Sequence, residues 1–310
     1  MKHGRSFSAA VYFSTACSAA LLAAGCQAPV SDAKAEESAG ALSAEQALSA
    51  GYLRTPFGLV HPDCVHEVAN NAPLRNARES CAHPMVRETS AARSGSNGVP
   101  DTNGWVEASW ADLSSPATFM HAQFDVPPIP ESQSDQVLFF FPSLEPSGGA
   151  AIIQPVLQWG TSAAGGAGYW AIASWYVDSS GNAEYSTLKR VNAGDVIDGL
   201  MEGSGCNDSG VCTWKITSED VNTGESTILN TQAGGFSYTQ AQGGVLEAYG
   251  ISTCGYYPTD NAITFSSISV QSGSTTLSPD YRAQGWSVSP SCGFSVNIDS
   301  ISSQTLHYSN

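Results

Sequence analysis

Two glutamines stand in an apolar stretch that reads as a buried β-strand, "GGAAIIQPVLQWG" at residues 148–160. Successive side chains of a strand point to opposite faces, so Gln154, Val156 and Gln158 share one face. A buried amide needs a partner, and its N–H group is suited to donate to a carbonyl or an oxyanion. We therefore take Gln154 and Gln158 as candidate site residues.

A third candidate is Glu247, which interrupts the apolar segment "GGVLEAYG". A carboxylate in such a strand is costly unless it has partners or a chemical task. Alternation places Glu247 on one face with Val245 and Tyr249. The alternative is a strand face open to solvent, on which this carboxylate is merely exposed. Glu145, in "PSLEPSGG", is expected in a loop, where a carboxylate is more often a surface group.

A zinc site has weaker support. The tripeptides "CVH" and "CAH" bring together His61, Cys64, His66, Cys81 and His83 as possible ligands. Their spacing fits no standard zinc finger, and an exported chain oxidises its thiols. We therefore expect a disulfide here, and neither a metal nor a cofactor in the protein.

A Ser-His-Asp triad and a phosphate-binding loop are also poorly supported. His121 and His307 lie among the expected strands, but no G-x-S-x-G motif accompanies them. The glycine-rich stretch "SAAGGAG" (162–168) lies between two expected strands. No helix follows it, so it does not match a phosphate-binding loop.

The elements that position these residues are short apolar segments separated by Gly, Ser, Asn and Pro. They predict strands, whereas long helix-period stretches are absent after residue 50. "VNTGES" (221–226) predicts a hairpin turn. We expect an all-β domain, a β-sandwich of two antiparallel sheets. The expected strands lie within 136–144, 151–160, 169–178, 212–221, 226–231, 244–252 and 262–270.

The excess of acidic over basic residues limits the kinds of molecule that this protein could bind. The chain has 310 residues, with 28 Asp and Glu against 12 Lys and Arg, and a net charge of -16. Nucleic acid needs a basic partner, so this balance argues against nucleic-acid binding. Only 13% of the residues are charged. The surface is therefore built largely from small polar residues, as is typical of extracellular β proteins.

The N-terminus predicts export. A basic start is followed by the apolar run "SAAVYFSTACSAALLAAG", so residues 1–25 are expected to be a signal peptide. "LLAAGC" resembles a bacterial lipobox, which makes Cys26 the expected lipidation site. The alternative is an ordinary signal peptide. No later apolar run reaches the ~18 residues of a membrane span, so we expect a secreted protein or a cell-envelope lipoprotein held only by lipid.

The rest of the chain divides by composition into three parts. Residues 26–50 are expected to be a flexible tether. Residues 51–98 are a small region with one expected disulfide, and residues 99–310 form the sandwich. Six cysteines remain after Cys17 and Cys26, and sequence proximity favours three pairs among fifteen possible sets. These pairs are Cys64–Cys81, Cys206–Cys212 and Cys254–Cys292.

Across most of residues 103–270 the chain resembles the eqolisin-type glutamic peptidases, which are acid proteases. "AAIIQPVLQWG" is similar to the A-I-L-Q-x-G strand of that family and places the catalytic glutamine at Gln154. "VLEAYG" is similar to I-V-E-D-F and places the catalytic glutamate at Glu247. Further matching segments follow in the family's order: "NGWVEASW", "AQFDVP", "YWAIASWYVD", "VNAGDVI", "ITSEDVNTGESTI" and "AITFSSI".

Two segments depart from the family. "FFFPSLEPSGG" stands where the family has Trp-Val-Gly-Ile-Asp-Gly, and Ala248 stands where an acidic residue follows the glutamate. The neprosins, which use two catalytic glutamates on a similar sandwich, offer a variant in which Glu145 contributes.

The resemblance implies a lectin-like (concanavalin A-like) sandwich with a polypeptide substrate across its concave face. Glu247 would act as general base on a water molecule, and Gln154 would stabilise the oxyanion. Residues 51–98 would be a pro-segment over the cleft or, alternatively, an accessory layer. We expect a monomer. The residues expected to line the cleft are Glu145, Gln158, Tyr169, Trp170 and Trp175, although core packing is the alternative for the aromatic ones.

Two other functions remain open. A lectin-like module would bind glycans or proteins without catalysis, because fold does not determine function. A glycosidase would need a second acid, such as Glu145, opposite Glu247. A peptidase needs Gln154 and Glu247 side by side on the concave face, and a purely structural cell-surface protein would show the two residues apart or exposed.

Overall fold

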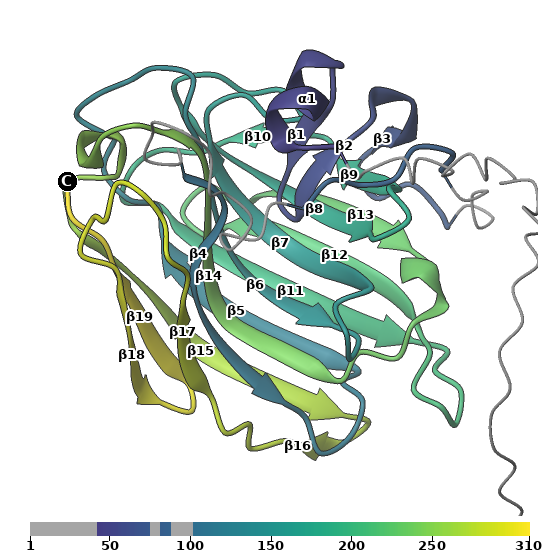
Figure 1. The fold of residues 1–310 in the computed structure, drawn as a ribbon. Coiled ribbons are helices and arrows are strands. Elements are labelled where there is room, and N and C mark those ends of the chain that lie inside the picture. The colour runs from purple at the N-terminus through teal and green to yellow at the C-terminus, as the bar shows by residue number, and fades with distance from the viewer. Residues whose placement is uncertain (1–41, 75–80, 88–101) are drawn as a thin grey trace, which may run out of the picture. The chain divides into compact units, whose positions relative to one another are not determined.

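The computed structural model describes residues 42–74, 81–87 and 102–310, and these described residues belong to one compact unit. Two large β-sheets pack face to face, as Figure 1 shows. The prediction of a two-sheet β-sandwich is therefore confirmed. The expected signal peptide, the lipidation site at Cys26 and most of the expected tether lie outside the described residues.

The first sheet has nine strands in the order β17-β4-β14-β6-β7-β8-β9-β3, with β10 paired to β8. All its pairings are antiparallel except the one between β3 and β9. Its strands are β17 (Arg282–Gly285), β4 (Thr102–Asp112), β14 (Gln240–Ile251), β6 (Val137–Glu145), β7 (Ala151–Trp159), β8 (Trp170–Asp178), β9 (Ala183–Ser186), β3 (Val65–Val68) and β10 (Lys189–Arg190).

The second sheet has eight strands in the order β13-β12-β11-β5-β15-β19-β18, with β16 paired to β15. The expected hairpin at "VNTGES" joins β12 to β13. Its strands are β13 (Glu225–Thr231), β12 (Thr213–Asp220), β11 (Val196–Ser204), β5 (Phe119–Asp125), β15 (Ala262–Ser272), β19 (Ser303–His307), β18 (Ser295–Ser300) and β16 (Thr275–Thr276). Two short 3-10 turns lie in the connections, η2 (Ala233–Gly235) and η3 (Cys254–Tyr256).

The three central strands β6, β7 and β8 are buried on both faces, which is why their sequences read as continuous apolar runs. One face packs on the second sheet and forms the main core. We call the opposite face the site face. A second apolar cluster covers it and joins strands of the first sheet to residues between 44 and 86.

The N-terminal region covers the site face with two short strands, β1 (Leu53–Thr55) and β2 (Gly58–Val60), which form a hairpin. A backbone bridge between Leu59 and Val86 ties this hairpin to the second described part of the region. We call residues 42–74 and 81–87 the arm. In Figure 1 its elements are the purple group that contains α1, β1, β2 and β3.

The end of the expected tether is not an irregular chain. Residues Ala44–Ser49 form helix α1, which begins at Ser43 with a capping box completed by Gln46. Ala44 and Ala47 are buried against the arm. The prediction of a flexible tether is wrong for this part, because the cap and two buried alanines outweigh the polar composition.

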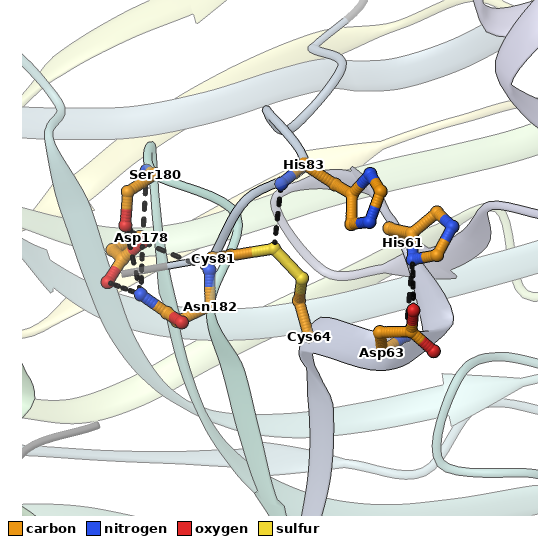
Figure 2. The surroundings of a disulfide bond; sticks show 8 residues. All are labelled: His61, Asp63, Cys64, Cys81, His83, Asp178, Ser180 and Asn182. Atoms are coloured by element: carbon orange, nitrogen blue, oxygen red, sulfur yellow. Dashed lines mark hydrogen bonds and ion pairs between the residues drawn. A yellow bond between two sulfur atoms is a disulfide. The ribbon is translucent and has the colours of Figure 1, made fainter. Parts of the chain in front are cut away.

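The three predicted disulfides are confirmed. The Cys64–Cys81 bond joins the two described parts of the arm, and Figure 2 shows its surroundings. Cys206–Cys212 and Cys254–Cys292 lie in the sandwich region. Within the described residues, no helix combines the length and apolar character needed to cross a membrane.

Candidate active site

Glu247 lies in the middle of β14 on the site face and is fully buried. Its Oε1 atom accepts a hydrogen bond of 2.5 Å from the Tyr249 hydroxyl. Burial raises the pKa of Glu247 to about 8, although the hydrogen bond from Tyr249 and the charge of Arg87 act in the opposite direction. The carboxyl group is therefore protonated at neutral pH in this arrangement.

Gln154 lies on β7, also on the site face and fully buried. Its Nε2 group donates to the backbone carbonyl of Pro56, which is in the tip of the β1–β2 hairpin. Its Oε1 atom has no hydrogen-bond partner among the described residues. The amide therefore directs its donor at a peptide carbonyl of the arm.

Strand β6 separates the strands that carry these two residues. Glu247 lies opposite Phe139, and Phe139 lies opposite Gln158, so Gln154 is four residues along β7 from the row of Glu247. The register therefore does not bring Gln154 and Glu247 side by side, and the contact they share is with the tip of the β1–β2 hairpin, which Glu247 reaches through Tyr249. The Thr55 carbonyl accepts from the Tyr249 hydroxyl at 3.4 Å, and the next carbonyl along the chain accepts from Gln154.

Gln158 is in the row of Glu247, but its own loop uses its amide. Its Nε2 group donates to the Gly160 and Gly165 carbonyls at 3.1 and 3.0 Å. Its Oε1 atom accepts from the Ser162 hydroxyl at 2.8 Å. All these contacts hold the β7–β8 connection, and the expectation that Gln158 binds substrate stays a prediction.

Glu145 is not in a loop as expected but is the last residue of β6, and it is 5% exposed. Its Oε1 atom accepts a 2.9 Å hydrogen bond from Gln242. Burial raises its pKa to about 7, against the opposing effects of Arg87 and this hydrogen bond. Glu145 and Glu247 thus share Arg87 as a nearby positive charge.

Both carboxyl groups line a pocket of about 300 Å³ between the arm and strands β4, β14 and β17. Three tryptophans contribute to it, Trp105, Trp110 and Trp286. The rings of Trp105 and Trp286 meet edge to face, with centroids 5.6 Å apart. Sequence reasoning missed this aromatic group, although "NGWVEASW" contains two of its members.

The predicted aromatic residues lie in three different environments. Trp175 is on the site face, directly opposite Gln154 on the neighbouring strand. Trp170 belongs to the core between the sheets, where it packs on Trp159, so its expected role in the cleft is wrong. Tyr169 lies beneath the Arg190 guanidinium group, 4.9 Å from it, and does not line the pocket.

No protein-family model and no curated protein matches this sequence. Solved structures of similar fold include scytalido-glutamic peptidase with a peptide-based transition state analog, at 15% identity and a TM-score of 0.51. That match covers 66% of this chain and 98% of the other. The chain thus shares the sandwich fold of a glutamic peptidase.

Two further structures are similar at lower scores. One is SCP-B, a member of the eqolisin family of peptidases in complex with the tripeptide Ala-Ile-His, with 16% identity, coverage of 66% and 98%, and a TM-score of 0.49. The other is aspergilloglutamic peptidase from Aspergillus niger, with 17% identity, coverage of 56% and 98%, and a TM-score of 0.42.

Proposed function

We propose that this protein is an exported endopeptidase of the glutamic type, in which Glu247 and Gln154 hydrolyse peptide bonds. One observation carries the proposal. Gln154 donates to the Pro56 carbonyl, and Tyr249, which donates to Glu247, lies 3.4 Å from the Thr55 carbonyl, so one stretch of peptide backbone contacts Gln154 directly and Glu247 through Tyr249. A lectin-like module has no need of an amide donor aimed at a peptide carbonyl.

The chemistry follows from these two groups. Ionised Glu247 takes a proton from a water molecule, whose oxygen attacks the carbonyl carbon of the substrate. The Gln154 N–H donates to the oxygen that gains negative charge, as it now donates to the Pro56 carbonyl. Glu247 then passes its proton to the departing amine. No covalent intermediate is formed. Glu247 takes one proton from the water and gives one proton to the amine, so it ends the reaction in its starting state.

The arm makes the described form latent. Its tip is a tight turn, in which Phe57 N–H donates to the Thr55 carbonyl at 2.8 Å and Thr55 Oγ1 donates to the Gly58 carbonyl at 2.8 Å. The turn occupies the place where an extended substrate would lie. Because its backbone is folded and not extended, its peptide bonds are not presented to Glu247 and Gln154 as those of a substrate would be. Burial under the arm also keeps Glu247 protonated below pH about 8, and a protonated carboxyl cannot act as base.

Release of the arm would expose Glu247 to water. Its pKa would then fall toward its ordinary value, because desolvation is the main cause of the rise. The carboxylate would be ionised at mildly acidic pH. We therefore propose that residues 51–98 act as a pro-segment and that activity requires their removal.

The site of action follows from the N-terminus and the disulfides. We propose that residues 1–25 direct export, that Cys26 carries lipid, and that the monomeric protein acts on polypeptides outside the cytoplasm. Three disulfides support an oxidising compartment.

The test is digestion of a denatured protein substrate between pH 2 and 7. For this test, a recognition sequence for a specific protease is introduced by mutagenesis within residues 88–101 of the mature chain, so that the arm can be cut from the sandwich on demand. We expect acid activity only after the cut. Glu247→Gln and Gln154→Ala should each abolish it, whereas Glu202→Gln, an exposed carboxyl on the second sheet, should not. Full activity of either site variant would refute the proposed catalytic roles.

A second candidate function is glycan binding or hydrolysis. It is favoured by the pocket in which Glu145 and Glu247 lie near three tryptophans, since paired acids and aromatic rings are the groups a glycosidase uses. The cut protein should be incubated with a polysaccharide panel. Polysaccharide cleavage that Glu145→Gln abolishes, without protein digestion, would select this function.

A further inference from the structure

A cluster of three potential metal ligands lies in the arm beside the Cys64–Cys81 disulfide. Figure 2 shows His61, Asp63 and His83 grouped on one side of the sulfur atoms. Their ligand atoms all lie within 4.8 Å of one another. In the described part of the chain, this is the one such group of three or more side chains.

The local structure holds these residues in place. His61 caps the 3-10 turn η1 (Pro62–Cys64), and its Nδ1 atom accepts a 3.3 Å hydrogen bond from the Asp63 backbone. The disulfide fixes the two arm segments beside each other, and His83 N–H lies 3.2 Å from Cys81 Sγ. The cluster therefore joins residues 22 positions apart in the sequence, 61 and 83, in one place.

The two imidazole rings stack with centroids 3.7 Å apart and an angle of 18° between their planes. Two neutral imidazoles and a carboxylate are a donor set that suits zinc and related divalent transition ions. Hard cations such as Mg²⁺ prefer oxygen donors and are poorly matched. The sulfur atoms are in a disulfide and are not ligands.

We propose that His61, Asp63 and His83 bind one divalent transition-metal ion, with water completing the coordination shell. Ligand atoms of a tetrahedral zinc site lie about 3.4 Å apart, given metal–ligand bonds of about 2.0–2.1 Å. The cluster must therefore contract by about an ångström, and the stacked rings must rotate so that both planes point to the ion. The Asp63 side chain is 78% exposed and is free to follow.

A metal ion at this position would join η1 to the segment that follows Cys81, as the disulfide already does. That segment continues to Val86 and Arg87, which contact the hairpin at Leu59 and Phe57. Metal binding would therefore stiffen the arm. An effect on latency rests on the proposed peptidase function, but the binding itself does not.

The test is calorimetric titration of the mature, disulfide-intact chain with zinc chloride at pH 7.5. We expect one site per chain, and at least tenfold weaker binding in His61→Gln, His83→Gln and Asp63→Asn. His66→Gln is the matched control, because His66 lies on β3 of the same arm outside the cluster. Mg²⁺ should not compete at equal concentration.

Three results would overturn the proposal. They are no zinc binding up to millimolar concentration, equal binding by wild type and His83→Gln, and equal competition by Mg²⁺, which would indicate attraction to the acidic surface only. Asp63→Asn changes an exposed side chain and should fold normally, so weaker binding by this variant cannot be attributed to misfolding. Because the readout is binding, a failure of the proposed catalysis would leave this result unaffected.

Discussion

At the scale of single residues, two glutamines on one strand face have opposite roles. Gln158 has three hydrogen bonds within its own connection, and a Cβ atom on Gly166 would come within 2.6 Å of its amide. Gln154 instead donates to a different segment of the chain and keeps a free Oε1 atom among the described residues. Gln158 thus stabilises its own connection, whereas Gln154 contacts the arm.

Substitution of each glutamine by alanine should separate the two roles. Gln158→Ala loses hydrogen bonds that contribute roughly 1 kcal/mol each, so its free energy of unfolding should fall by about 2–3 kcal/mol. Gln154→Ala loses its hydrogen bond to Pro56, so the free energy of unfolding of the uncut chain should fall by about 1 kcal/mol, and kcat should fall by about 10²–10³-fold once the arm is cut. Urea unfolding and peptide hydrolysis measure the two effects. The reverse pattern would assign the catalytic amide to Gln158.

Glu107 is a buried carboxyl group that does not line the pocket, and it affects the pH dependence of stability. It lies on β4 and is fully buried, and burial raises its pKa to about 9. The folded state therefore keeps a proton that the unfolded chain releases above its ordinary pKa. The stabilising effect of that proton is complete at acid pH and is lost as pH rises toward 9.

Glu107→Gln should reduce the pH dependence of stability. The substitution removes one titrating group, which contributes at most about 1.4 kcal/mol per pH unit between the unfolded and folded pKa values. We expect the wild type to lose more stability than the variant between pH 5 and 8 in urea unfolding. Parallel loss in the two proteins would show that Glu107 keeps an ordinary pKa.

At the scale of elements, the β1–β2 hairpin is the part of the arm that reaches the site. Phe57 at its tip is 1% exposed, and the Arg87 guanidinium lies 3.8 Å from the ring centroid. Further along the arm, β3 pairs with β9 at the edge of the first sheet. The hairpin thus covers Gln154 and Glu247, while β3 anchors the arm elsewhere.

Phe57→Ala should weaken the latent state without touching the catalytic groups. Truncation of a buried phenylalanine costs about 3–5 kcal/mol of packing, here between the hairpin and the site face. We expect the uncut chain to gain several-fold in acid peptidase activity, measured by hydrolysis of a denatured substrate. The cut chain should be unchanged, and Ile129→Ala, which is exposed outside the arm, is the control. An uncut variant as inactive as wild type would show that the hairpin tip does not block the site.

At the scale of the whole molecule, three buried glutamates among the described residues have raised pKa values. These are about 9 for Glu107, about 8 for Glu247 and about 7 for Glu145, each with burial as its main cause. Below the ordinary pKa of glutamate, both folded and unfolded states are protonated at these positions. Above it, only the unfolded chain releases the protons, so rising pH favours unfolding.

The uncut protein should therefore be most stable in acid. We expect the melting temperature to be highest near pH 4–5 and to fall toward pH 8, with the net charge of -16 adding repulsion at neutral pH. Scanning calorimetry across pH 4–9 measures this trend. A melting temperature that rises from pH 5 to 8 would contradict it.

The sequence by itself determined which side chains share a strand face and which fold class the strands form. Alternation placed Gln154 beside Val156 and Gln158, and Glu247 beside Tyr249, and the structure agrees. Disulfide pairs followed from the proximity of the cysteines along the chain. These are local properties, because a strand's two-residue period depends only on its own backbone.

Only the tertiary structure decided what surrounds those faces. The order β17-β4-β14-β6 brings Trp286, Trp105, Glu247 and Glu145 to one pocket from distant parts of the chain. The arm then buries Glu247 and meets Gln154 with a carbonyl. The order of the strands and the docking of the arm depend on contacts between residues far apart in the sequence. The periodicity of a single strand's sequence holds no information about such contacts, so it could not predict them.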